Sequence, residues 1–281
     1  QILAWTRYFS RNLDDRIRSR PCQFHCEVYN RKQLSEEDAD AIVFHFRDIH
    51  RNMVLPKSRR PGQIYVSFLK EAPTHAGGAT NIGKVQIQFL REYHTDIAQD
   101  DFNGMVANKT GEVLAIISNC HAGGRLEYVK KLSRFINVTT VGSCFGRRIS
   151  AKMEESLISS HYFVIAFENV VCEDYVTEKF WRIDKDIVPI VLRRRILKGK
   201  APDESFVAAD DFSSPRELAT HLKSAVAKRE EYRKYFAYRN THYKVQVDGF
   251  CNLCRDLHYK NVSSTSNLNM KEYYSASRQC E

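Results

Sequence analysis

The residues with the clearest chemical potential lie in one stretch, His161 to Trp181, which reads HYFVIAFENVVCEDYVTEKFW. Its apolar run from Tyr162 to Phe167 has the length and composition of a buried strand. A polar loop follows, and a helix is expected to begin at Thr177, whose hydroxyl suits an N-cap. A buried strand that ends in a polar loop and feeds a helix start is the usual ligand site of an open α/β sheet.

The start of that helix would offer backbone N–H groups to an anion, and Lys179 places a positive charge beside them. The residues alone therefore predict a phosphate or nucleotide site. Each side chain also has a plainer interpretation. Glu178 could only complement the helix dipole, Tyr175 could pack in the core, and Lys179 could be a solvated helix residue.

A second chemical candidate follows a different strand. QIYVSF, at 63–68, runs directly into Lys70, Glu71 and Pro73. A carboxylate just past the C-terminal end of a strand is well placed to serve as an acid or a base, so Glu71 is a catalytic candidate. The alternative is a solvated loop acid.

The elements needed to position these residues alternate regularly in the C-terminal half. Strands are predicted at 112–118, 137–143, 161–167, 187–192 and 205–212. Helices are predicted at 124–136, 150–160, 176–184 and 214–232. Strands that alternate with helices of this length indicate a parallel, doubly wound α/β sheet.

The N-terminal half is less regular. Strands are predicted at 1–6, 41–46 and 63–68, whereas 7–31 is polar, charged and loop-like. A linker around 103–111 sets the expected division: an N-terminal domain at 1–110, a C-terminal domain at 111–258 and a mobile Ser- and Asn-rich tail at 259–281. Cys280, in that tail, is expected to be an odd thiol.

Charge and composition limit the classes of partner that the protein could bind. The chain has 281 residues and carries a net charge of +9, which could suit nucleic acid, an anionic membrane surface or a phosphorylated ligand. No arginine-rich arm, zinc finger or RNA-binding aromatic signature supports nucleic acid, so that alternative rests on charge alone. No apolar run approaches the roughly 18 residues of a membrane-spanning helix. Any anchor is expected upstream of Gln1.

Eight cysteines favour an oxidising compartment. Cys22 and Cys26 near the start, with Cys251 and Cys254 near the end, could form either disulfides or one four-sulfur zinc site, and we favour disulfides. Three glycosylation sequons point the same way. They begin at Asn108, Asn137 and Asn261.

FENVVCEDYVTEKFW, the second part of the opening stretch, strongly resembles the signature of the α-1,3-fucosyltransferase family, roughly F-E-N-S followed by D-Y-[VI]-T-E-K. The resemblance continues from about Ile2 to Leu257. The other segments that carry it are AWT, DADAIVFHFRD, RPGQIYVSFLKEAPTH, AIISNC followed by Arg125, VPIVL, SPREL and the C-x-x-C at Cys251.

This resemblance implies a GT-B-type glycosyltransferase with two Rossmann-like domains facing a cleft. The N-terminal domain would hold the acceptor and the C-terminal domain would hold GDP-fucose. The last helix, with Cys251 and Cys254, would pack back on the N-terminal domain. Members of the family are single-pass type II proteins of the Golgi membrane, so this chain would be luminal, with its membrane anchor outside the chain.

The resemblance also implies roles for individual residues. Glu71 matches the general base of an inverting transfer of fucose to a GlcNAc hydroxyl, most simply in an α-1,3 linkage. The donor-contacting positions match Arg125 and Lys179 at the phosphates, Glu178 near the sugar hydroxyls, and Asn169 and Tyr175. No metal is obligatory in such a site, with manganese at most stimulatory.

The disulfide prediction is that Cys22 and Cys26 bond with Cys251 and Cys254. One further bond is expected among Cys120, Cys144 and Cys172, with its partners left open.

Some residues depart from the family pattern. Val170 replaces the usual Ser after F-E-N, the helix continues as FWRIDKD, and Arg193-Arg194 stands where glycines are common. Only LREYHTDI resembles the acceptor-side motif. Acceptor identity, antennal or core GlcNAc, therefore stays open. The alternative function is a catalytically weak glycan- or nucleotide-binding homologue of the same fold.

Overall fold

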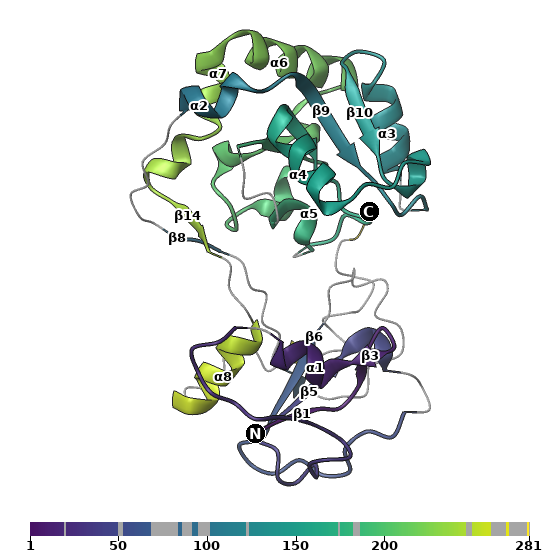
Figure 1. Cartoon of the computed structure of the whole chain (residues 1–281), viewed down its shortest axis with the longest axis vertical. Coiled ribbons are helices and arrows are strands. Elements are labelled where there is room, and N and C mark those ends of the chain that lie inside the picture. The colour runs from purple at the N-terminus through teal and green to yellow at the C-terminus, as the bar shows by residue number, and fades with distance from the viewer. Residues whose placement is uncertain are drawn as a thin grey trace. The chain divides into compact units, whose positions relative to one another are not determined.

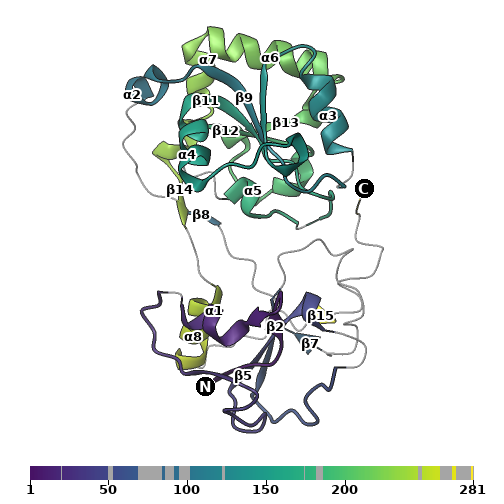
Figure 2. The same cartoon turned by 45° about the vertical axis from the view of Figure 1, so that its right-hand side comes forward.

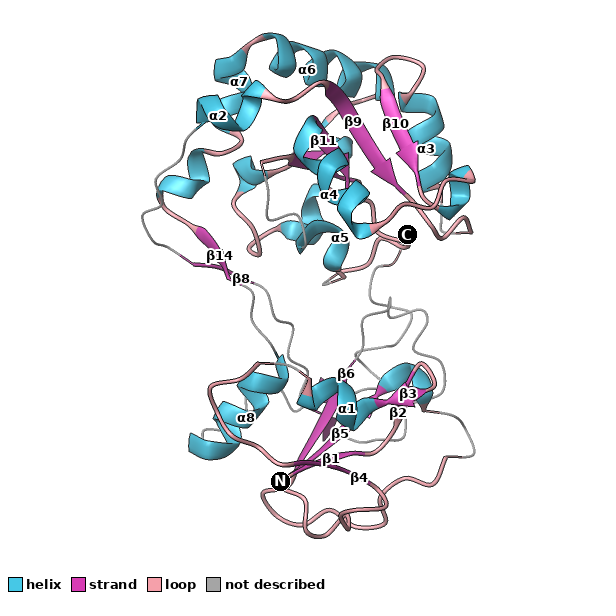
Figure 3. Ribbon diagram, viewed as in Figure 1, coloured by secondary structure: helices cyan, strands magenta, loops and turns pink. Residues whose placement is uncertain are grey.

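The chain forms two compact units. The computed structural model describes residues 1–19, 21–49, 53–68, 84–85, 92–94, 102–121, 124–173, 175–181, 186–245, 249–259, 268–269 and 280. The first unit comprises Gln1–Arg91 and Gln246–Arg278, and the second comprises Glu92–Val245 and Gln279–Glu281. Both are built on parallel sheets, in agreement with the α/β class (Figure 3).

The first unit is built on a four-stranded sheet in the order β4-β1-β5-β6 (Figures 1 and 3). All three strand pairs are parallel. The strands are β1 (Ile2–Ala4), β4 (Val28–Asn30), β5 (Ala41–His45) and β6 (Ile64–Phe68). One face packs on Leu13 and Ile17 of α1 (Leu13–Arg18) and on Phe250 and Leu253 of α8 (Gly249–Tyr259).

The expectation of a loop at 7–31 is wrong in part. A short hairpin of β2 (Arg7–Tyr8) and β3 (Arg11–Asn12) is followed by α1 and β4. Leu13 and Ile17 lie one turn apart on α1 and are both buried. Arg18 closes the same helix with an ion pair to Asp14, Nη2 to Oδ2, of 2.6 Å. Two buried apolar side chains and the ion pairs from Arg18 to Asp14 and Asp15 therefore stabilise a helix amid charged residues.

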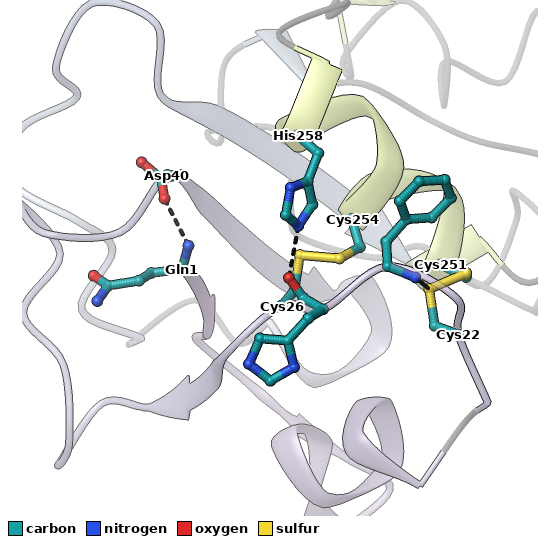
Figure 4. The surroundings of a disulfide bond; sticks show 9 residues. Gln1, Cys22, Cys26, Asp40, Cys251, Cys254 and His258 are labelled. Atoms are coloured by element: carbon teal, nitrogen blue, oxygen red, sulfur yellow. Dashed lines mark hydrogen bonds and ion pairs between the residues drawn. A yellow bond between two sulfur atoms is a disulfide. The ribbon is translucent and has the colours of Figure 1, made fainter.

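Helix α8 is joined to the N-terminal segment by two disulfides, Cys22–Cys251 and Cys26–Cys254 (Figure 4). Their Cα–Cα distances are 5.2 and 5.8 Å. The predicted pairing is thereby confirmed, and the four sulfurs are bonded to one another rather than arranged as zinc ligands. His258 adds a hydrogen bond between its Nε2 and the carbonyl oxygen of His25, 2.7 Å apart.

The second unit contains a five-stranded parallel sheet in the order β10-β9-β11-β12-β13 (Figure 2). Its strands are β9 (Gly111–Ile116), β10 (Val138–Val141), β11 (His161–Ile165), β12 (Val188–Val191) and β13 (Val207–Ala208). The central strands β9, β11 and β12 are largely apolar and buried because helices cover both faces of the sheet.

One face of this sheet packs against α2 (Phe102–Ala107), α3 (Arg125–Leu132), α6 (Pro215–Ala227) and α7 (Arg229–Lys234). The other face packs against α4 (Ala151–Ser160) and α5 (Glu178–Trp181). Ser150 and Ser214 cap α4 and α6 by accepting a hydrogen bond from the backbone N–H three residues later. Single 3₁₀ turns occupy Phe46–Asp48, Ser143–Phe145, Arg194–Leu197, Asp203–Ser205, Ala209–Asp211 and Ala237–Asn240.

The division between the units lies before the expected linker. Phe102 and Val106 of α2 belong to the hydrophobic core of the second unit, so the change of unit falls at Arg91/Glu92 rather than after residue 110. The chain changes unit again after β14 (Tyr243–Val245), which pairs antiparallel with β8 (Glu92–His94).

The expectation of a mobile tail also needs correction where the tail is described. β15 (Leu268–Asn269) pairs antiparallel with β7 (Lys84–Val85) in the first unit. Cys280 is bonded to Cys172 and is not an odd thiol. Cys120 and Cys144 form the further bond that the sequence left without partners. Among the helices described, none combines the length and the apolar character needed to cross a membrane.

Gly111, the first residue of β9, lies against His161, the first residue of β11. A Cβ atom at position 111 would overlap the imidazole ring. The ring has little freedom to move, because its Nδ1 lies 2.7 Å from the Leu157 carbonyl oxygen and its Nε2 lies 2.8 Å from Thr139 Oγ1. Since a carbonyl only accepts, Nδ1 carries the proton.

We expect Gly111→Ala to lower the free energy of unfolding by about 1–3 kcal/mol, the usual effect of overpacking. Urea unfolding measures it. In a double-mutant cycle, the effect should shrink in a His161→Ala background, where the ring is gone. An equal effect in both backgrounds would show that the imidazole is not the obstacle.

Candidate functional site

The order of strands in the second unit creates a natural ligand site between β9 and β11. From β9 the chain goes to β10 on one side, and then to β11 on the other. Loops that leave neighbouring strands in opposite directions open a crevice at the carboxyl ends of the strands, where open α/β sheets bind ligands. Asn119 and Arg125 follow β9, and Glu168 and Asn169 follow β11.

Arg125 joins the two loops. Its Nη2 donates to the Asn119 carbonyl oxygen at 2.7 Å, and its Nη1 donates to the Phe167 carbonyl oxygen at 3.3 Å. The side chain is buried, and its Nε has no hydrogen-bond partner. Burial lowers the pKa of the guanidinium, while the nearby Glu168 raises it. Arg125 is therefore an internal cross-link between the loops, a role that the sequence did not reveal.

Glu168 is the centre of a second set of contacts. Its Oε1 accepts hydrogen bonds from the Thr177 backbone N at 2.6 Å and from Thr177 Oγ1 at 2.8 Å. Its Oε2 accepts from Lys179 Nζ at 3.0 Å. Burial raises the pKa of this carboxyl, and the Lys179 ammonium opposes that rise. The carboxylate thus closes the β11–α5 loop by joining its first residue to the start of the helix.

These contacts change the interpretation of the helix start. The Thr177 N–H is bonded to Glu168, and the Lys179 N–H donates to Thr177 Oγ1 at 3.4 Å. The backbone donors expected to face an anion are thus partly used within the protein. The Lys179 ammonium has three donors, and it bonds to Glu168 and to Thr177 Oγ1, the latter at 2.9 Å. Its ammonium group remains partly accessible to a ligand, with 22% of the side chain exposed.

Asn169 and Tyr175 lie in the same loop. The Asn169 Oδ1 is buried and accepts no hydrogen bond. A buried acceptor without a donor is unfavourable by about 1–3 kcal/mol, so it indicates a place where a ligand could supply an N–H or O–H. Tyr175 is 6% exposed and close enough to Arg125 to influence its pKa. Glu178 is exposed, and its Oε1 is 3.7 Å from Lys179 Nζ.

A small pocket lies at this end of the sheet. Its lining includes Arg125, Phe167 and Lys179. Two positively charged residues and the end of β11 therefore share one small concave surface, so their charges converge at the carboxyl end of the sheet. Glu168 is the buried acid beside this pocket. The sequence marked this residue by its place after the apolar run and within the F-E-N of the family signature, but did not reveal its contacts.

Glu71 and Asn261 fall outside the described residues, whereas Asn108 and Asn137 are described and exposed. Within the described part of the chain, the one grouping of potential metal-binding side chains is Cys26, Cys254 and His258 in the first unit. Two of these are joined in a disulfide.

Two family models cover most of the chain. The model described as "Glycosyltransferase family 10 (fucosyltransferase) C-term" matches residues 106–273, and "Fucosyltransferase, N-terminal" matches residues 1–97. The chain belongs to this fucosyltransferase family. The predicted family is thereby confirmed, and the site described above lies within the C-terminal match.

Several members are similar to this chain. It is 28% identical over 289 residues to Alpha-(1,3)-fucosyltransferase fut-1 of Caenorhabditis elegans, covering 90% of this chain and 64% of the relative. It is 36% identical over 177 residues to Glycoprotein 3-alpha-L-fucosyltransferase A of Drosophila melanogaster, covering 59% of this chain and 35% of that protein. The chain thus spans less than two thirds of the length of these two fucosyltransferases.

A crystal structure of an α1,3-fucosyltransferase with GDP-fucose has a similar fold. The TM-score is 0.56 at 16% identity, with 94% of this chain and 91% of that chain covered. A structure of an α1,3-fucosyltransferase with GDP gives a TM-score of 0.53 at 16% identity, with 95% and 92% covered. The likeness confirms the predicted fold class, a GT-B-type α/β glycosyltransferase.

Glu168 and Glu178 both lie beside Lys179, which allows a matched comparison. Glu168→Ala should lower the free energy of unfolding by about 3 kcal/mol, because it leaves Lys179 and the Thr177 N–H without their buried acceptor. Glu178→Ala should change the free energy of unfolding by less than about 0.5 kcal/mol, because the Glu178 carboxylate is exposed and solvent weakens its interaction with Lys179. Urea unfolding of the two variants tests this, and equal losses would contradict the assigned role of Glu168.

Proposed function

We propose that the protein transfers L-fucose from GDP-fucose to a hydroxyl of GlcNAc in a glycan acceptor, with inversion and in an α-1,3 linkage. Family membership supports fucosyl transfer, and the names of the fut-1 protein and of the Drosophila relative support the linkage. The observation that carries the donor assignment is the pocket at the β9–β11 switch point, where Lys179 and Arg125 share one surface.

The donor would use the groups that the fold leaves accessible. The GDP pyrophosphate needs fixed positive charge, and the Lys179 ammonium supplies it. The buried Asn169 Oδ1, which has no hydrogen-bond donor in the protein, would accept a hydrogen bond from an N–H or O–H group of the base or the sugar. Arg125 would contribute its charge to the phosphates while its Nη groups hold the loops together. Tyr175 and Glu178 would complete the contacts to the nucleoside and sugar.

In the reaction, the acceptor oxygen forms a bond to the anomeric carbon of fucose as the bond from that carbon to the phosphate oxygen breaks. The electron pair leaves with GDP, and the hydroxyl proton passes to a carboxylate acting as general base. We assign that carboxylate to Glu71. Because the protein's own charged side chains stabilise the leaving group, the proposal includes no obligatory metal, with manganese at most stimulatory.

The setting of the reaction is also part of the proposal. A Golgi lumen suits the four disulfides among the described residues. The exposed sequon asparagines at 108 and 137 are accessible to glycosylation. The membrane anchor of a type II protein would lie outside this chain.

Glu71→Gln tests the base. We expect kcat for fucose transfer to a GlcNAc-terminated glycan to fall by about 10²–10⁴-fold, because the amide cannot take the hydroxyl proton. The affinity for GDP should be unchanged. Glu37→Gln, an exposed acid of the same unit, is the control and should keep wild-type activity. Equal activity of the two variants would refute the assignment of Glu71, and linkage analysis of the wild-type product would identify the acceptor hydroxyl.

Lys179→Ala tests the donor site. GDP affinity, measured by titration calorimetry, should weaken by about 10- to 100-fold, since a charged hydrogen bond to phosphate is lost. Lys179→Arg should recover part of the affinity by restoring the charge. Lys130→Ala, an exposed lysine on α3, should bind GDP as the wild type does. Unchanged affinity in a folded Lys179→Ala variant would refute the phosphate role.

GDP binding by the wild type without any fucose transfer would favour the alternative of a catalytically weak homologue.

A further inference from the structure

Residues 168–173 and 175–177, here called the nucleotide loop, lie between β11 and α5 and carry the donor-site residues Asn169 and Tyr175. The two ends of this loop are joined to each other, because the Glu168 carboxylate accepts from the Thr177 N–H and hydroxyl. That contact fixes the ends of the loop. Within the loop, Val171 is buried in the hydrophobic core and the Val176 carbonyl oxygen accepts a hydrogen bond from Trp181 Nε1 at 3.1 Å. Between these two residues the loop has a further anchor.

The middle of the nucleotide loop is held by a covalent bond. Cys172 is fully buried and is bonded to Cys280, with a Cα–Cα distance of 4.0 Å. The two cysteines are 108 residues apart in sequence. Gln246–Arg278 belongs to the first unit, but Gln279–Glu281 belongs to the second. The cysteine that holds the loop therefore comes from a segment that is remote in the chain from every other donor-site residue.

Asn169 gives a reason for this anchor. Its Oδ1 is buried without a hydrogen-bond donor, which is unfavourable in the absence of ligand. A loop free to move would turn that oxygen out to water. The bond at Cys172, three residues along, opposes such a movement and keeps the acceptor in place when no ligand is bound.

We propose that the Cys172–Cys280 disulfide is a positioning element of the donor site. It holds the nucleotide loop in its ligand-binding conformation before the nucleotide arrives. Residues that are ordered in advance do not lose conformational entropy on binding, so the affinity is higher. The identity of the ligand, GDP-fucose, rests on the proposed function, whereas the ordering of the loop does not.

Cys280→Ala tests the proposal without changing a residue of the loop. The Cys172 thiol that remains is tolerated in an apolar site, since a free cysteine packs as a small hydrophobic side chain. GDP affinity, measured by calorimetry, should weaken about tenfold. The reason is that the site is no longer prearranged in the variant and must be ordered when the nucleotide binds. The KM for GDP-fucose should rise similarly with kcat little changed, because the loop contacts are made in both the ground state and the transition state.

Two further variants separate positioning from stability. Cys22→Ala/Cys251→Ala removes a disulfide of the first unit, so it should lower Tm but leave GDP affinity unchanged. Cys172→Ala/Cys280→Ala should match Cys280→Ala, which excludes an effect of the freed thiol. Wild-type GDP affinity in both Cys280 variants would overturn the proposal, because the bond would then serve stability alone.

Amide hydrogen exchange distinguishes a failure of this proposal from a failure of the proposed function. In the absence of ligand, the amides of residues 168–177 should exchange faster in Cys280→Ala than in the wild type. If the wild type binds no GDP, the proposed donor is wrong, and the exchange rates alone decide about positioning. Unchanged exchange across the loop would then overturn it, and faster exchange would support it.

Discussion

The donor-site end of the second unit depends on one buried carboxylate. Removing Glu168 from water is unfavourable by several kcal/mol unless its oxygens are bonded, and Thr177 and Lys179 together satisfy both. This requirement joins the end of β11, the loop after it and the start of α5 into one structural element. It also sets the position of the Lys179 ammonium, so the group that neutralises the buried acid is the same group that we assign to the phosphates.

The architecture of the second unit was predictable because its signals are local. Its central strands β9, β11 and β12 are largely apolar, and Ser150 and Ser214 stand at the starts of α4 and α6 as caps. The elements missed in the first unit lack such signals. Helix α1 is six residues long, and β4 buries only Val28. Helix α2 lies in a segment that was predicted to be a linker, and Phe102 and Val106 belong to a core that is contributed mainly by distant residues.

The candidate site was predictable in its membership but not in its internal contacts. The order of residues from Glu168 to Lys179 identified the family and the loop, yet gave no sign that Glu168 would bond to both Thr177 and Lys179. Arg125 was expected at the phosphates, whereas its Nη groups are bonded to carbonyl oxygens at 119 and 167. Long-range pairs such as Cys172–Cys280 are set by tertiary structure, and no local pattern encodes them. Glu71 is outside the described residues and stays a prediction.

The disulfides bear on the order in which the protein is completed during synthesis. Cys120 and Cys144 are only 24 residues apart and can meet early. Cys172 must wait for a partner made 108 residues later, and Cys22 waits through 229. During that interval a growing chain exposes thiols that could pair wrongly with one another. Correct maturation therefore requires either that these thiols stay reduced until their partners have been made or that wrong pairs are reshuffled afterwards, a slow step that takes seconds to hours in general. The yield of the mature protein should thus be governed by the disulfide-isomerising capacity of the cell that makes it.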